Sequence, residues 1–183
     1  MFASNETSIS LFNLIIVYLI DQSHSRIIDY NLNNTKKMVL KKPNIIREIA
    51  QELDCGFDCY YNFKTDEILT IPNSLQFTDE ENFKEAFQLE FQKIQENEAD
   101  YNKFEVLKSF ESFKIMERFV AQISDNNFQS ELDIILKKKK PFQNFKKVID
   151  HSDFGQNWFE FKQNELEKIV ESKMSFFYDS NNL

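Results

Sequence analysis

The stretch with the clearest chemical character is a run of lysines between residues 137 and 147. Six of these eleven residues are lysine, and Pro141, Phe142 and Phe145 are interleaved with them. Residues 109–150 hold eight bases and six acids, so this region is locally positive in a chain whose net charge is −8. Ammonium groups beside the free N–H groups at a helix start attract anions. The candidate contacts are Lys139, Lys140, Lys146 and Lys147.

The lysine run has two interpretations. In the first, its ammonium groups dock an acidic protein or a phosphate-bearing ligand. In the second, they form a solvated loop and helix face while Phe142 and Phe145 pack in a core, which is the more common arrangement for such a run. General binding to nucleic acid is not expected, because that affinity depends on many lysine and arginine contacts and this chain is acidic.

Trp158 is the only tryptophan in the chain and the second candidate for contact with a partner. Tryptophan is enriched at interfaces, where it often anchors binding. However, Trp158 is in register with Phe161 and Leu166 on one face of a predicted helix, so the spacing favours packing in a core. An exposed aromatic anchor is the alternative.

Metal-ligating and nucleophilic residues are few. His151 lies next to Asp150 and Asp153, where it would act as a general base or a metal ligand. Together with Cys55 and Cys59 it offers three nitrogen or sulfur ligands, whereas a structural zinc site uses four. Two glycines in the whole chain are too few for a glycine-rich phosphate loop. We therefore predict no metal, no cofactor and no assigned catalytic residue.

An enzyme or a ligand-binding regulator remains the alternative to a binding module. Its site would use scattered carboxylates and tyrosines, but no spacing singles out a carboxylate pair for acid–base work. The candidates are Tyr60, Tyr61, Glu67 and Glu117. The absence of a catalytic pattern favours a non-enzymatic binding or interaction module with a basic-aromatic patch near residues 137–147.

The N-terminal region differs from the rest of the chain. Its apolar run, residues 11–20, is about half the length that crosses a bilayer and lacks the basic start and cleavage site of a signal peptide, so we expect a cytoplasmic protein. Residues 1–37 have three acids and three bases and no helix start signal. Our hypothesis is that Met38 is the native start of a single domain over residues 38–183, and that residues 1–37 are an N-terminal extension, either an added tail or translated upstream sequence.

A helix and a hairpin are predicted next. Asn44 is a suitable cap for a helix with apolar residues at helical spacing, and Gly56 ends it. Two β-rich runs, residues 60–63 and 68–71, flank a polar turn and predict a β-hairpin.

An acidic segment follows the hairpin. Thr78 and Glu81 form a capping box ahead of an amphipathic helix over residues 79–100. Residues 79–108 hold nine acids and four bases, so this segment either contacts a basic partner, shields the chain's own lysine run, or is a solvated helix face, which we prefer. A short third strand is predicted over residues 104–107.

Four helices are predicted in the C-terminal half. Ser109 and Ser124 are the expected caps of the first two, Pro141 begins the third, and the last starts near Phe154. The regularly spaced apolar residues of this half, many of the chain's 20 phenylalanines among them, are expected to exclude water from one interior. The predicted fold is therefore α+β and mostly helical, with a small antiparallel hairpin or three-stranded sheet packed on a C-terminal bundle of about four helices.

Three segments of the helical half carry a family likeness: Ser109–Phe119, Lys140–Lys146 and Trp158–Lys162. In the hairpin, Thr65 and Glu67 are also placed as in that family, which usually has glycine where this chain has Asp66. These segments resemble uncharacterised protein family 0158, a bacterial group of unknown function. The likeness spans residues 44–171 and implies a small cytoplasmic α+β protein, without any catalytic residue to carry over.

Overall fold

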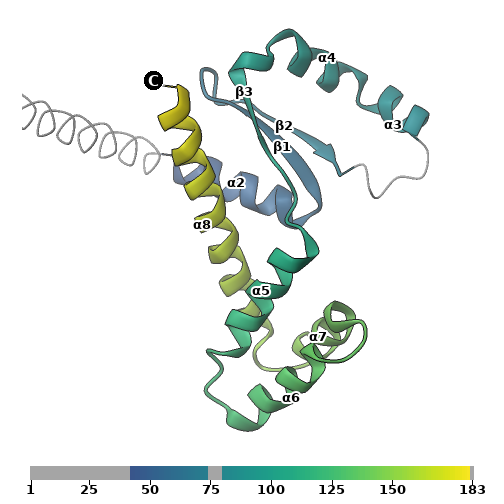
Figure 1. The fold of residues 1–183 in the computed structure, drawn as a ribbon, viewed down its shortest axis with the longest axis vertical. Coiled ribbons are helices and arrows are strands. Elements are labelled where there is room, and N and C mark those ends of the chain that lie inside the picture. The colour runs from purple at the N-terminus through teal and green to yellow at the C-terminus, as the bar shows by residue number, and fades with distance from the viewer. Residues whose placement is uncertain (1–41, 74–79, 182–183) are drawn as a thin grey trace, which may run out of the picture. The chain divides into compact units, whose positions relative to one another are not determined.

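The computed structural model describes residues 42–73 and 80–181 (Figure 1). These residues form seven α-helices, one short 3₁₀ helix and a three-stranded antiparallel sheet, which confirms the predicted α+β class. The chain divides into two compact units, residues 43–173 and residues 1–42 with 174–183. The predicted extension over residues 1–37, the start at Met38 and the capping residue Thr78 lie outside the described residues. Among the helices described, none has the length and apolar character needed to span a membrane.

Helix α2 (Pro43–Asp54) forms because its apolar residues recur at helical spacing. Its buried residues are Ile46, Ile49, Ala50 and Leu53. The helix begins at Pro43, a residue favoured in the first turn, so Asn44 lies inside it and the predicted cap is wrong. Gly56 adopts a φ of 92°, which turns the chain from α2 into the sheet and confirms the predicted end of this helix.

Strand β1 (Phe57–Asn62) lies between β2 (Ile68–Pro72) and β3 (Tyr101–Phe104), and both neighbours are antiparallel to it. The hairpin is thus confirmed, whereas the third strand ends at the residue where it was predicted to begin. Helix α2 packs on β1, where the buried Cys59 Sγ lies 3.9 Å from a backbone oxygen of α2. After β3, the Val106 N–H donates to Asp58 Oδ1 at 2.9 Å and holds the connection to α5 against β1.

The hairpin turn places Asp66 in a backbone conformation that glycine adopts more readily. Asp66 adopts a φ of 63°, in the left-handed region where a side chain costs energy and glycine does not. The Tyr61 hydroxyl donates to Asp66 Oδ1 at 2.5 Å, and Asn62 Oδ1 accepts from the Lys64 N–H at 2.9 Å. The bond from Tyr61 holds the Asp66 side chain, and the bond to Asn62 Oδ1 holds the backbone of the same turn.

The predicted continuous helix over residues 79–100 is wrong. The segment instead forms three short helices: α3 (Glu80–Ala86), α4 (Gln88–Glu96) and a 3₁₀ helix (Glu98–Asp100). The break falls at Phe87, whose φ of −114° and ψ of 23° are not helical. The ring of Phe83 lies 5.2 Å from that of Phe87 and 6.1 Å from that of Phe91, so aromatic contacts cross the break.

Four helices follow the sheet, as predicted. They are α5 (Ser109–Val120), α6 (Asn126–Leu136), α7 (Pro141–Ile149) and α8 (Gly155–Asn181). Both predicted serine caps are displaced by one residue. Lys108 precedes α5 and its N–H donates to the Glu111 carboxylate at 2.9 Å, while Asp125 caps α6 by accepting from two backbone N–H groups. Pro141 begins α7, as predicted.

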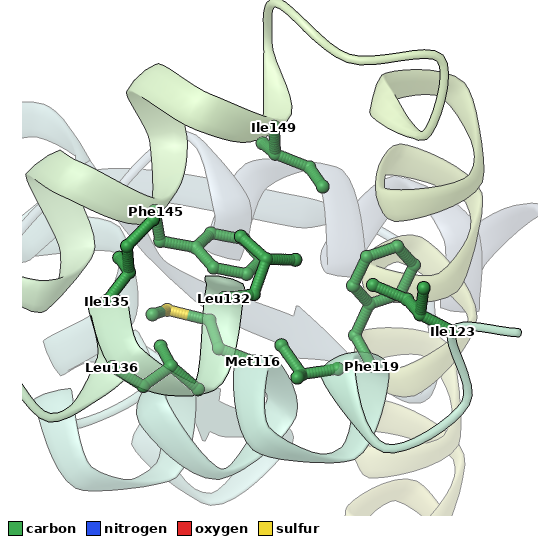
Figure 2. Close-up of a cluster of buried hydrophobic side chains, with 9 residues drawn as sticks. Met116, Phe119, Ile123, Leu132, Ile135, Leu136, Phe145 and Ile149 are labelled. Atoms are coloured by element: carbon green, nitrogen blue, oxygen red, sulfur yellow. The ribbon is translucent and has the colours of Figure 1, made fainter. Parts of the chain in front are cut away.

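One hydrophobic cluster holds these helices together. Figure 2 shows the side chains of Met116, Leu132 and Phe145 converging between α5, α6 and α7. The buried members are Met116, Phe119, Val120, Ile123, Leu132, Ile135, Leu136, Phe145 and Ile149. Each large apolar side chain that is fully buried contributes roughly 1.5–3 kcal/mol, so the predicted interior of this half is confirmed.

Candidate functional site

A cavity of about 370 Å³ is lined by residues of α2, the β3–α5 connection, α5, α7 and α8. This volume lies within the range of ligand-binding cavities, roughly 300–1,000 Å³. Most of the lining is apolar, including Leu53, Val106 and Met116. The polar side chains in it are those of Asp54, Ser112, Lys146 and Lys162. A few polar groups around an apolar interior are typical of a site that binds part of a ligand or partner.

Trp158 forms one aromatic wall of the cavity and also belongs to the core. Its ring lies edge-on to Phe119 at 5.2 Å and to Phe145 at 5.0 Å. Both neighbours are buried, whereas Trp158 is half-buried and lines the cavity. The packing role favoured by the spacing is therefore correct, and one part of the indole is still available to an occupant.

Phe142 forms a second aromatic wall and was expected to lie in the core. It is 41% exposed and lines the cavity, with its ring 6.2 Å from that of Phe113. Phe145, one helical turn later, is 2% exposed. Both phenylalanines line the cavity, but only Phe145 is buried in the hydrophobic cluster. The core prediction is therefore confirmed for Phe145 and wrong for Phe142.

An ion pair across the cavity wall was missed by the sequence analysis. Lys162 Nζ lies 2.7 Å from Asp54 Oδ2, and the two side chains are only 28% and 30% exposed. The same ammonium lies 5.9 Å from the centre of the Trp158 ring, a distance at which a cation is attracted to the aromatic face. The four-residue spacing from Trp158 places Lys162 on the same helix face, which was the one signal available in the sequence.

Among the four predicted lysine contacts, only Lys146 lines the cavity. Its Nζ also lies 2.8 Å from Asp150 Oδ2, one helical turn later, and both side chains are exposed. Such a surface pair contributes little and exchanges readily with another carboxylate. Lys146 and Trp158, predicted separately, are therefore brought to one place.

The other three lysines lie on the exposed surface beside the cavity. Lys140 precedes α7 with a φ of 57°, and the Asn144 side chain donates to the Lys139 carbonyl at 2.9 Å, which fixes the loop. Lys147 is exposed on α7. No carboxylate of the described chain forms an ion pair with Lys139, Lys140 or Lys147, so their charges are available to a partner.

The candidate enzyme residues are not brought together. Tyr60 and Tyr61 are consecutive in β1, so their side chains lie on opposite faces of the sheet. Glu67 follows the hairpin turn, and Glu117 lines a separate cavity that it shares with Asp133. These four side chains therefore form no common site.

Glu67 itself is held in a polar cluster at the hairpin. Its carboxylate accepts from Lys93 Nζ and, at 2.6 Å, from the Tyr101 hydroxyl. These hydrogen bonds, that from Lys93 first, lower the pKa of Glu67. Burial, followed by the bond to Glu67, raises the pKa of Tyr101 to about 12. An ionised carboxylate with both oxygens occupied is suited to fixing the hairpin rather than to accepting a proton.

Neither His151 nor either cysteine is among the residues that line the cavity. His151 is exposed, and its Nδ1 lies 2.8 Å from the Lys147 carbonyl oxygen. Cys55 is exposed, whereas burial raises the pKa of Cys59 to about 12. In residues 42–73 and 80–181 no group of three His, Cys, Asp or Glu side chains is placed to hold a metal ion.

Over residues 20–175 the chain matches the family model described as Uncharacterised protein family (UPF0158). The match covers the hairpin, the acidic segment and every residue that lines the cavity. It begins before Met38, within the segment predicted to be an extension, and the hypothesis about the start of the chain stays a prediction. Among curated proteins and among solved structures, no match was found.

Proposed function

Because this chain belongs to the uncharacterised protein family UPF0158, as its sequence resemblance predicted, we propose its function from its own surface: it is a binding module that docks an acidic segment of a partner protein. The observation that carries this proposal is that Phe142, Lys146 and Trp158 line one cavity. We call the exposed lysines of residues 137–147, together with this cavity, the basic-aromatic site.

The cavity supplies the apolar part of the binding. A side chain of leucine or phenylalanine inserted between Phe142 and Trp158 would remove apolar surface from water on both sides. Clusters of this kind, with an aromatic wall and a partly desolvated charge, dominate the binding energy of many protein interfaces. Met116 and Val106 close the interior with further apolar surface.

The lysines supply selection by charge. Lys137–Lys140 and Lys147 are exposed and have no ion pair within the described residues, although the protein as a whole carries a net charge of −8. Charges at the rim of an interface raise the association rate and reject partners of the same sign. An acidic segment with one apolar side chain matches both parts of the basic-aromatic site.

Fluorescence of Trp158 tests this proposal directly, because the chain has one tryptophan and it lines the cavity. The probe is a short synthetic peptide of Asp and Glu residues around one Leu or Phe. We expect a saturable change in Trp158 emission and a dissociation constant that rises at least about tenfold in 1 M salt, where charges are screened beyond about 3 Å. A peptide with Asn and Gln in place of the acids is the matched control.

The variant Lys139→Glu/Lys146→Glu should abolish the response without lowering the melting temperature. Lys140 is left unchanged because its φ of 57° makes substitution there a backbone perturbation. Arg47→Glu, the same type of charge reversal at one exposed residue of α2, should leave binding intact. The proposal fails if the neutral peptide binds as well as the acidic one, or if inorganic phosphate but no acidic peptide changes the emission.

A further inference from the structure

We infer that the acidic segment bound by the basic-aromatic site is the α3–α4 segment of a second copy of this chain. This inference rests on the proposed function and names its partner. Residues 80–100 hold seven acids and two lysines, and none of residues 82–100 lines the cavity of its own chain. Each copy would therefore carry both a basic-aromatic site and the segment that fits it.

Helix α4 has the anchor that the cavity requires. Leu89 is 77% exposed, the largest exposure among the large apolar residues of the described chain. No residue of α4 is buried, so the surface of this helix is accessible to a partner. Contact with a second copy would remove the Leu89 side chain from water, which favours association.

The acids of the segment are placed around this leucine. Glu96 lies two helical turns after Leu89, about 10 Å along α4, and Glu85 precedes the break at Phe87. Both glutamates are exposed, and no ion pair holds either of them within the described residues. The second lysine of the segment, Lys93, is already paired with Glu67 and does not oppose the attraction.

Insertion of Leu89 into the cavity would bring these acids beside the lysine run. Phe142 and Trp158 would contact the leucine, while Glu85 and Glu96 would face exposed ammonium groups that have no carboxylate of their own. Two such contacts made reciprocally close a twofold dimer, and a single contact repeated head to tail extends into a chain. In both arrangements, association depends on opposite charges carried by the same protein.

Charge reversal on each side gives a sharp test. One variant carries Glu85→Lys/Glu96→Lys and the other Lys139→Glu/Lys146→Glu. By analytical ultracentrifugation at low salt and ~100 μM, in the range of weak protein contacts, the unmodified protein should associate and each variant alone should be monomeric. An equimolar mixture of the two variants should associate again, because the reversed segment of one then matches the reversed site of the other.

A third variant tests the anchor. Leu89→Ser removes an exposed side chain, so the fold should be unaffected, whereas self-association should weaken about tenfold or more as the buried apolar surface is lost. Trp158 emission should then no longer depend on protein concentration. Arg47→Glu is the control and should associate like the unmodified protein.

The outcomes separate this inference from the proposed function. A monomeric unmodified protein that still binds the acidic synthetic peptide would overturn the second copy as the partner and leave the binding module intact. Association that is equally strong in all variants would overturn the inference as well. If the charge-reversed mixture associates but Trp158 emission responds to no acidic peptide, the basic-aromatic site is not the docking surface and the proposed function fails.

Discussion

Helix α7 offers a matched pair of substitutions that compares a buried phenylalanine with a partly exposed one, both of which line the cavity. Phe145 is 2% exposed within the nine-residue cluster, and Phe142, on the same helix, is 41% exposed at the cavity. Truncation of a buried phenylalanine to alanine costs about 3–5 kcal/mol, because transfer energy is lost and a cavity remains. Phe145→Ala should therefore lower the free energy of unfolding by that amount, a large part of the ~5–15 kcal/mol typical of a domain.

Phe142→Ala should cost far less. Since the ring is almost half exposed, it contributes about half of the roughly 1.5–3 kcal/mol gained by complete burial, or about 1 kcal/mol. Alanine is also the better helix former by a few tenths of a kcal/mol, a gain shared by both variants. We therefore expect Phe145→Ala to be less stable than Phe142→Ala by at least about 2 kcal/mol.

Urea denaturation followed by circular dichroism measures this difference without relying on Trp158, whose ring contacts Phe145. The same variants should separate binding from folding. Phe142→Ala removes one wall of the cavity, so it should weaken binding of the acidic peptide while the protein stays folded. Equal losses of stability for the two variants would refute the placement of Phe142 at the cavity. So would full peptide binding by Phe142→Ala.

Two further predictions concern the hairpin. Asp66→Ala should be less stable than Asp66→Gly by about 1 kcal/mol in urea denaturation, because both lose the same side-chain hydrogen bond but only alanine pays for the left-handed φ; equal stabilities would contradict the strain. Glu67→Gln should make the free energy of unfolding depend less on pH in acid. The hydrogen bond from Lys93 is the main cause that holds the pKa of the Glu67 carboxyl below its usual 4.5. The ionised carboxylate therefore stabilises the fold above pH 4.5, and this stabilisation is lost as the pH falls through the lowered pKa. Urea midpoints measured from pH 6 to 3 check this, and parallel curves for the two proteins would contradict it.

Most of the local structure could be predicted because each element carries its own pattern. The apolar spacing of α2, the β-rich runs of the hairpin and Pro141 at the start of α7 needed no tertiary information. The caps were less predictable, because Ser124 and Asp125 are both good capping residues and the choice depends on backbone geometry. The break at Phe87 could not be predicted, because no glycine or proline lies there to indicate it.

The cavity could not be predicted, because its lining comes from segments far apart in the chain. Periodicity assigns Phe142 and Phe145 the same role, and only the packing of α7 against its neighbours separates them. Likewise, Asp54 and Lys162 are at the end of one helix and inside another, and nothing in either segment indicates their ion pair. The sequence identified Lys146 and Trp158 as candidates, but only the fold shows that both line the same cavity.

The same packing links occupancy of the cavity to the stability of the helical half. Trp158 contacts Phe119 and Phe145 and also lines the cavity, as Phe145 does, so an occupant would contact rings that are already part of the core. Asp54 of α2 and Lys162 of α8 also line the cavity, and their ion pair joins α2, which packs on the sheet, to α8. A ligand that binds only the folded chain raises its stability in proportion to the logarithm of ligand concentration. The unmodified protein should therefore melt at a higher temperature in the presence of the acidic peptide, and Phe142→Ala, which keeps the core but lacks one wall of the cavity, should lose that increase.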